Sequence, residues 1–377
     1  AAGELAGGIA VAAAVWFLAR SSSLGAVLTG MAVSALGAVG ILLPKWTDST
    51  LLHIVDSAAD GAGGVAANIA EYLRADLGTG RMLVFGAALL LDCVVAATGG
   101  LGTPQAKVIL TLRMFTPALA AWVVCRFVTH ESWLRESGLA RRPPGSGGRL
   151  GWLRILGFAT IGVGVVVAAL TLLLALVIGT GWFRLDWALT SFTNNLRGIA
   201  PEGSLPPVAV LWVLAIVANV FAAYTINGLF ALGEEVGWRG WLQVALEPLG
   251  RRRGVVLTGV IWGLWHAPLI VMGYEYDDRL PVAVGIVLFT CLCGGLGVLL
   301  SWLRVRSGSV VPAAITHGAF NAFASLPAIL VAPGDGLDPV LVGLIGWPAA
   351  VLFGLLAVLL LSGSWAGRTG AGQGTPS

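Results

Sequence analysis

Residues 207–239 read PVAVLWVLAIVANVFAAYTINGLFALGEEVGWR. The part from 207 to 232 is almost entirely apolar, and a helix needs about 20 such residues to cross the hydrocarbon layer of a membrane. The run then meets Glu234 and Glu235, with Arg239 following on the same stretch. Ionisable groups at membrane depth are costly, and they usually mark a reaction site or an ion pathway. This stretch therefore predicts a membrane-spanning helix with a functional site at its end.

The rest of the chain has the same apolar character. Its 377 residues are 57% hydrophobic and 11% charged, with a mean hydropathy of +0.88, whereas a soluble protein carries roughly 25% charged residues. The net charge of +3 is too small to suggest nucleic-acid binding. We predict an all-α, polytopic integral membrane protein with about ten transmembrane helices. The runs of spanning length are 5–19, 24–44, 82–98, 108–128, 155–180, 207–232, 255–273, 282–303, 309–332 and 338–361.

Arginines are concentrated in alternate connecting segments. Residues 129–154 and 233–254 are rich in arginine, and Arg304 and Arg306 follow the eighth run, whereas the segments between them hold little positive charge. Positively charged connections tend to stay in the cytoplasm. We therefore expect both termini on the cytoplasmic side, although residues 181–206 place two arginines outside.

A flexible cytoplasmic linker is predicted at residues 138–150, which combine Gly, Pro, Ser and Arg. It separates an amino-terminal set of membrane helices, residues 1–137, whose role is unassigned, from a carboxy-terminal domain at 151–365. That domain would be a six-helix core, with all the polar motifs inside 207–332. Residues 366–377 are expected to be a flexible tail.

Three pairs of residues in the carboxy-terminal domain have helical spacing. Residues four apart lie on one face of a helix. The pairs are Glu235 with Arg239, Trp262 with His266, and His317 with Asn321. With the expected topology, the three helix faces can meet in a cavity open to the cytoplasm, somewhat below the membrane surface.

One carboxylate, two imidazoles and an amide are sufficient for hydrolysis of a peptide bond by water. Glu234 would act as general base, and His266 would orient the water or bind a metal. His317 and Asn321 would donate hydrogen bonds to the developing oxyanion. Equally, Glu234, His266 and His317 make up the ligand set of a catalytic zinc site with an open fourth position. The spacing does not decide between these mechanisms, and the common His-Glu-x-x-His helix is absent from the sequence.

These motifs resemble those of the CPBP family of intramembrane proteases, which includes the type II CAAX prenyl endopeptidases and the bacterial Abi-like proteins. The family pattern is Glu-Glu-x-x-x-Arg, then Phe-x-x-x-His, then His-x-x-x-Asn or Asp. This chain has the first motif at Glu234–Arg239 and the third at His317–Asn321. In the second motif Trp262 replaces Phe ahead of His266. The resemblance covers about a third of the chain, roughly residues 207–332.

The resemblance implies an intramembrane endopeptidase whose protease domain occupies residues 151–365. It assigns Glu234 as the catalytic acid and base, His266, His317 and Asn321 to the same site, and Glu235 with Arg239 to a structural ion pair. The family has been described both as metalloproteases and as glutamate-dependent proteases. A zinc cofactor on Glu234, His266 and His317 therefore stays open beside a metal-independent mechanism.

The expected substrate is a membrane-associated peptide or protein within the lipid bilayer. Prenylated CAAX substrates are largely eukaryotic, whereas the twenty arginines and two lysines of this chain are typical of a high-GC bacterial genome. We expect an integral protein of the bacterial cytoplasmic membrane with its active site open to the cytoplasm. The substrate class stays open.

Two other classes of function fit part of the pattern. In an ion-coupled transporter, the same Glu and His residues would relay protons or bind a cation, but carriers often contain two related halves and these motifs lie in one half only. A non-catalytic immunity or scaffold protein is the other class. Each motif also has a structural interpretation, as a polar helix end, a buried histidine or an interhelical hydrogen-bonding pair.

Two further groups of residues are predicted to be structural. Asp92 is expected to pair with Arg113 or Arg126 rather than to relay protons. Trp238 and Trp241, which flank Arg239, are expected to anchor a helix end at the membrane surface, where tryptophan is enriched, rather than to shape a substrate entry.

Overall fold

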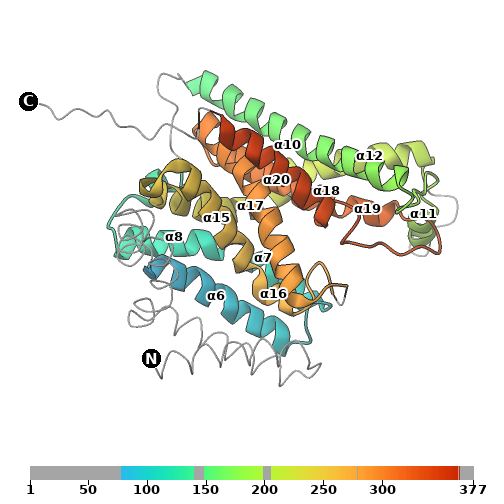
Figure 1. Ribbon diagram of the computed structural model, residues 1–377, viewed down its shortest axis with the longest axis horizontal. Coiled ribbons are helices and arrows are strands. Elements are labelled where there is room, and N and C mark those ends of the chain that lie inside the picture. The colour runs from blue at the N-terminus through green and yellow to red at the C-terminus, as the bar shows by residue number, and fades with distance from the viewer. Residues whose placement is uncertain (1–77, 140–147, 198–204, 278, 364, 366–377) are drawn as a thin grey trace, which may run out of the picture. The chain divides into compact units, whose positions relative to one another are not determined.

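The computed structural model describes residues 78–139, 148–197, 205–277, 279–363 and 365 (Figure 1). The predicted spans at 5–19 and 24–44, most of the predicted linker and the predicted tail at 366–377 lie outside the described residues.

The chain forms two compact units, and it passes between them more than once. The described part of the first unit comprises residues 78–133, 265–277 and 279–283, and the second begins at Leu134, runs to Leu264 and resumes at Val284. A segment that begins inside the second polar motif, at Trp265, thus belongs to the same unit as residues 78–133. The domain boundaries at 137, 150 and 365 stay a prediction.

The all-α prediction is confirmed. Each named element among the described residues is a helix, and an isolated β-bridge joins Leu185 to Val331. Five described segments are long and apolar enough to cross a membrane, namely Pro104–Phe127, Gly151–Gly179, Val208–Ala245, Arg251–Val271 and Val282–Ser307. Helices Val84–Ala97 and Trp347–Ser362 are apolar but shorter. The chain is therefore a polytopic membrane protein, and the total of about ten spans stays a prediction.

The apolar run 309–332 forms two helices instead of one. α18 (Val311–Ala324) ends at Ser325, and the short α19 (Leu326–Ile329) follows directly. Pro327 lies in the first turn of α19. Proline has no N–H to donate and disfavours a helical conformation in the residue before it, so the helix is interrupted here.

The first unit is built from α6 (Gly78–Ala97), α7 (Pro104–Arg113), α8 (Thr116–Phe127) and α16 (Ala267–Val271). α6 packs against α7, α8 and α16. The Thr103 hydroxyl caps α7 by accepting a hydrogen bond from the Ala106 N–H at 3.2 Å. Pro104 follows this cap, at a position where the missing N–H is not needed.

In the second unit, α18 lies among several longer helices. α10 (Gly148–Gly179), α12 (Val208–Tyr224) and α13 (Ile226–Glu235) each pack against α18, and α20 (Trp347–Ser362) packs against α10. α15 (Arg251–Trp265) and α17 (Val282–Ser307) supply the other long helices, and each crosses from one unit to the other at one end. The shorter elements are α9 (Trp133–Glu136), α11 (Thr190–Arg197), η2 (Val236–Leu242), α14 (Gln243–Ala245) and η3 (Glu247–Leu249).

Glycines allow the helices that carry the motifs to approach one another closely. A Cβ added at Gly318 of α18 would lie 2.5 Å from the Gly228 nitrogen of α13, and a Cβ at Gly263 of α15 would lie 2.5 Å from Thr290 Cα of α17. Small residues at such contacts let helix backbones pack tightly in membranes. Gly228 and Gly318 therefore allow direct contact between α13, where the first motif begins, and α18, which holds the third.

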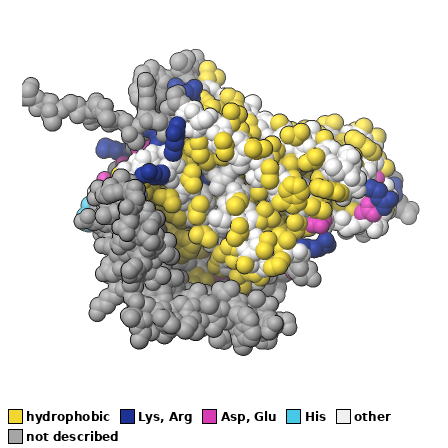
Figure 2. Space-filling model, in the orientation of Figure 1, with side chains coloured by type: hydrophobic (Ala, Val, Ile, Leu, Met, Phe, Trp, Pro, Cys, Tyr) yellow, Lys and Arg dark blue, Asp and Glu magenta, His cyan; other side chains and the backbone are white. Residues whose placement is uncertain are grey.

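Large apolar side chains cover much of the described surface, as expected for helices that face lipid. In α12, for example, Val213, Val217 and Phe221 are all exposed. Figure 2 shows hydrophobic side chains over most of the described surface in view, with Lys and Arg gathered toward its edges.

Two connections of the second unit are joined outside the membrane-spanning segments. The Asp186 N–H donates to the Leu330 carbonyl at 2.9 Å, and the Ala332 N–H donates to the Arg184 carbonyl at 3.2 Å. The Arg184 guanidinium also donates two hydrogen bonds to Asp335, at 2.8 and 2.6 Å. This hydrogen bonding, together with the positive charge, lowers the pKa of Asp335.

Candidate active site

A change in helical winding carries the first motif. α13 ends at Glu235 and continues without a break into the π-helix η2 (Val236–Leu242), whose C-terminal N–H at Gln243 donates to the Trp238 carbonyl. π-helical turns are rare, and they occur frequently at functional sites. The whole motif is buried, with Glu234 2% exposed and both Glu235 and Arg239 fully enclosed.

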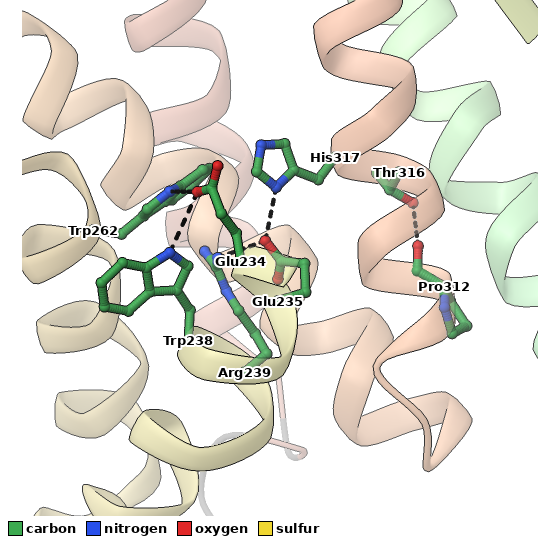
Figure 3. A network of polar contacts seen from close by, with 8 residues as sticks. All are labelled: Glu234, Glu235, Trp238, Arg239, Trp262, Pro312, Thr316 and His317. Carbon is green, nitrogen blue, oxygen red and sulfur yellow. Dashed lines mark hydrogen bonds and ion pairs between the residues drawn. The ribbon is translucent and has the colours of Figure 1, made fainter. Parts of the chain in front are cut away.

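Glu234 is held by two indoles. Its Oε2 accepts hydrogen bonds from Trp262 Nε1 at 2.7 Å and from Trp238 Nε1 at 3.3 Å (Figure 3). Two donors on one oxygen fix the orientation of the carboxylate, and hydrogen bonds to an ionised group are stronger than those between neutral groups. Trp262 occupies the position at which the CPBP pattern has Phe, which has no hydrogen-bond donor. The substitution therefore adds a contact to the predicted catalytic glutamate.

Glu235 links the first and third motifs. Its Oε1 accepts from Arg239 Nη1 at 2.9 Å and lies 2.9 Å from His317 Nδ1 (Figure 3). The Arg239 guanidinium carbon also lies 4.4 Å from the centroid of the Trp262 ring, an arrangement that favours a cation. The ion pair that the family resemblance implies is therefore present, and Glu235 also reaches α18 through His317.

The contact with Glu235 determines how His317 can act. Because an ionised carboxylate only accepts hydrogen bonds, Nδ1 of His317 carries the proton. Nε2 is then an acceptor in the neutral imidazole and a donor in the imidazolium. The ring also meets Trp262 edge-on, with centroids 5.0 Å apart. In Figure 3 the second oxygen of Glu234 and the far end of the His317 ring lie on the same side of the network.

The remaining predicted site residues are placed differently. His266 belongs to the first unit, where it precedes α16 and its ring contacts those of Trp265 and Tyr274, with centroids 4.8 and 6.5 Å apart. Asn321 lies one turn beyond His317 on α18 and is exposed. The structure thus gathers Glu234, Glu235, Arg239 and His317 in the second unit.

Trp238 is a site residue that the sequence interpretation missed. It was expected to anchor a helix end at the membrane surface, but it is only 2% exposed and its indole N–H donates to Glu234. The spacing of four between Glu234 and Trp238 was the available signal, because it places both on one helix face. Trp241 is half-buried.

The predicted zinc ligands do not form a set within one unit. Glu234 and His317 lie in the second unit and His266 in the first. Within the described part of the chain, no group of three His, Cys, Asp or Glu side chains is spaced to hold a metal ion. In the second unit, moreover, the Glu234 and His317 atoms described above already contact indoles and a carboxylate. The zinc site on Glu234, His266 and His317 therefore stays a prediction, and we derive no step through a metal.

Comparison with known proteins supports the assignment of the motif region. Residues 205–323 match the family model described as type II CAAX prenyl endopeptidase Rce1-like, and all three polar motifs fall inside that match. Residues 205–323 belong to the CPBP family. The resemblance inferred from the motifs is thereby confirmed for this segment.

This chain is also similar to a curated protein, the CAAX prenyl protease 2 of Methanococcus maripaludis. The two are 30% identical over 109 residues, which cover 27% of this chain and 39% of the relative. The matched residues of this chain therefore span well under half of the length of that relative. The helices of the first unit that precede residue 205 lie outside the match with the family model.

Proposed function

We propose that this protein is an intramembrane endopeptidase that hydrolyses a peptide bond of a membrane-associated protein or peptide. Glu234 activates the attacking water. The observation that carries the proposal is the buried Glu234 carboxylate, oriented by two indole donors beside a histidine that a second glutamate holds. Membership of residues 205–323 in a family of proteases supports the same conclusion.

In the first step, Glu234 accepts a proton as the water oxygen bonds to the carbonyl carbon of the substrate. The carbonyl oxygen then becomes an oxyanion, which needs donors aimed at it. His317 in its imidazolium form supplies one through Nε2–H, while Nδ1–H stays on Glu235. Asn321 supplies a second donor. Glu234 finally returns its proton to the departing amine as the carbon–nitrogen bond breaks.

The indoles have a definite part in this step. A general base must present an oxygen within hydrogen-bond reach of the proton that it takes. Trp238 and Trp262 hold Oε2, so the orientation of the other oxygen is fixed before substrate arrives. Preorganisation of this kind lowers the barrier because the group does not have to reorient during the reaction.

His266 would orient the water in this scheme. A zinc ion on Glu234, His266 and His317 is the alternative that the sequence left open. The two differ in their response to a chelator. Purified full-length protein dialysed against 1,10-phenanthroline should keep its cleavage rate under the metal-independent mechanism. Loss of the rate, with recovery on addition of zinc, would establish the alternative.

The test compares the termini of membrane peptides in cells, measured by mass spectrometry at matched expression. The variants are wild type, Glu234→Gln, His317→Ala and, as a matched control, Glu247→Gln in η3, which changes a nearby carboxylate outside the network. We expect the same new termini in cells with wild type and in cells with Glu247→Gln. None of these termini should appear with Glu234→Gln or His317→Ala. Identical termini in all four strains would contradict the proposal and favour a transporter or scaffold.

The same experiment addresses the substrate. The curated relative is named for CAAX prenyl proteins, and we propose a membrane-associated peptide more generally. Termini that lie directly after a modified cysteine would favour a prenyl substrate. Termini within apolar or surface segments of other membrane proteins would favour a different peptide class.

A further inference from the structure

A buried ion pair joins two helices of the first unit. Arg113, at the end of α7, donates through Nε to Asp92 Oδ1 at 2.7 Å and through Nη2 to Oδ2 at 3.1 Å. Asp92 lies on α6 and is fully buried, as is nearly all of Arg113. Two parallel hydrogen bonds between a guanidinium and a carboxylate are both strong and geometrically specific.

The same guanidinium holds a third element, Trp265, the last residue of α15. Nη2 of Arg113 donates to the Trp265 carbonyl at 2.6 Å, and the guanidinium carbon lies 3.6 Å from the centroid of the indole ring. The last carbonyls of a helix have no partner within the helix, and a cation is favourable at that end. Arg113 therefore fixes both the backbone and the side chain of Trp265.

His266 is the next residue, and it forms the junction between two helices. Its carbonyl accepts from the N–H groups of Leu269 and Ile270 at 3.0 and 3.1 Å as α16 begins. Its ring meets the Trp265 ring at 88°, with centroids 4.8 Å apart. The direction of the His266 side chain thus depends on a backbone and a ring that Arg113 holds.

Stability alone does not account for this arrangement. Burying two charges has a large desolvation penalty, and replacing such a pair with apolar side chains of similar volume is often neutral or stabilising. The pair joins α6 and α7 and also binds the last residue of α15, directly before His266. An apolar contact would not fix the position of that residue in the same way.

We propose that Asp92 and Arg113 are positioning residues for His266, acting through Trp265. This inference rests on the proposed function, in which His266 orients the attacking water. It gives Asp92 and Arg113 one task, namely to set the angle of the His266 side chain, without making either of them a catalytic residue.

The test uses the full-length protein in lipid nanodiscs and a farnesylated fluorogenic peptide with a Cys-aliphatic-aliphatic-X end as probe. The main variant is the double substitution Asp92→Leu with Arg113→Met, which removes both charges and leaves no uncompensated ion. Arg126→Met, which removes an exposed arginine of α8, is the matched control. The readouts are kcat, KM, the unfolding temperature and hydrogen exchange of residues 266–272.

For the double variant we expect an unfolding temperature close to that of wild type, an unchanged KM and a kcat lower by about 10-fold or more, since small misplacements of catalytic groups have effects of that order. Hydrogen exchange at residues 266–272 should become faster, because the junction between α15 and α16 loses the contacts made by Arg113. This readout does not depend on cleavage of the probe. Arg113→Lys keeps the positive charge but lacks the planar guanidinium, so its kcat should lie between those of the double variant and wild type.

A second background separates positioning from a structural role. If Asp92 and Arg113 act through His266, the double substitution should cause no further fall in kcat when His266 is already Ala, because effects of residues that act as a unit are not additive. A full additional fall in the His266→Ala background would overturn the inference. So would wild-type kcat and wild-type exchange in the double variant.

Glu234→Gln distinguishes failure of this inference from failure of the proposed function. If Glu234→Gln abolishes cleavage while the double variant behaves as wild type, only the positioning role is wrong. If Glu234→Gln cleaves the probe at the wild-type rate, the proposed function itself is wrong.

Discussion

Each of the two units contains a buried Asp or Glu paired with an arginine, and the two pairs are built differently. Asp92 and Arg113 come from different helices and are joined by two hydrogen bonds, with the backbone carbonyl of Trp265 as a further acceptor. Glu235 and Arg239 lie one turn apart and share one hydrogen bond. The first pair joins two helices directly, whereas the second lies within one motif and reaches another helix only through His317.

The two pairs also differ in how fully their polar atoms are satisfied. Among the described residues, Glu235 Oε2 and Arg239 Nε and Nη2 are buried without a hydrogen-bond partner. Buried polar atoms are normally paired, and each exception calls for an explanation. Glu235 instead commits one oxygen to both Arg239 and His317. The incomplete pairing of Glu235 and Arg239 is consistent with a role for Glu235 in holding His317 rather than in stabilising the fold.

The largest effect on stability should come from breaking one side of the first pair. Asp92→Leu alone leaves the Arg113 charge buried, which should lower the free energy of unfolding by about 3–5 kcal/mol. The double substitution with Arg113→Met should recover most of that loss. Unfolding of the purified variants by heat or by denaturing detergent measures both. Equal losses in the single and double variants would contradict the ion-pair account.

Glu235→Gln should have a smaller effect on stability and a clear effect on activity. The neutral amide can still accept from Arg239, but it loses the charge assistance, so the free energy of unfolding should fall by about 1.5–3 kcal/mol. Cleavage should also fall, because the contact that holds His317 is weakened. The ratio of kcat between Glu235→Gln and wild type measures this, with Glu247→Gln as control.

Trp262→Phe restores the residue of the CPBP pattern and removes one indole donor from Glu234. The aromatic ring stays beside Arg239 and His317, so the fold should be kept, while cleavage should fall by about 10-fold because the carboxylate is less well oriented. Trp238→Phe should have a weaker effect, since its hydrogen bond is 3.3 Å rather than 2.7 Å. A larger loss of cleavage with Trp238→Phe would contradict the conclusion that Trp262 is the more important donor to Glu234.

The smallest effect is expected at the exposed pair of Arg184 and Asp335. The pKa of Asp335 is lower in the folded protein than in the unfolded chain, chiefly because Arg184 donates hydrogen bonds to it. Its stabilising contribution is therefore present above the ordinary carboxyl pKa and is lost as the pH falls through the lowered folded value. Asp335→Asn should remove this acid dependence. Unfolding temperatures of both proteins across acidic pH, at low and high salt, measure the difference.

Much of this organisation could be predicted from the sequence. The apolar runs near 108–128, 155–180 and 282–303 correspond to helical segments of spanning length, because apolar length is the main determinant of a membrane span. The spacing of four within the first motif likewise predicts the contact between Glu235 and Arg239, since such residues share a helix face.

Other features depend on tertiary structure. Asp92 had two arginines as candidate partners, and only packing selects Arg113. The π-helical winding after Glu235 has no distinctive residue pattern, so neither it nor the approach of the Trp262 indole to Glu234 could be predicted. Assignment of His266 to the first unit likewise follows from contacts between segments that are far apart in sequence.

The central claim is that Glu234 activates water for peptide hydrolysis. The most direct test incubates full-length wild type and Glu234→Gln, each in lipid nanodiscs, with the farnesylated peptide in heavy-oxygen water. Mass spectrometry then measures the new carboxyl terminus. The account predicts one heavy oxygen in the wild-type product, and no product from Glu234→Gln at an unchanged unfolding temperature. Product formed by Glu234→Gln at the wild-type rate, or a wild-type product without heavy oxygen, would contradict it.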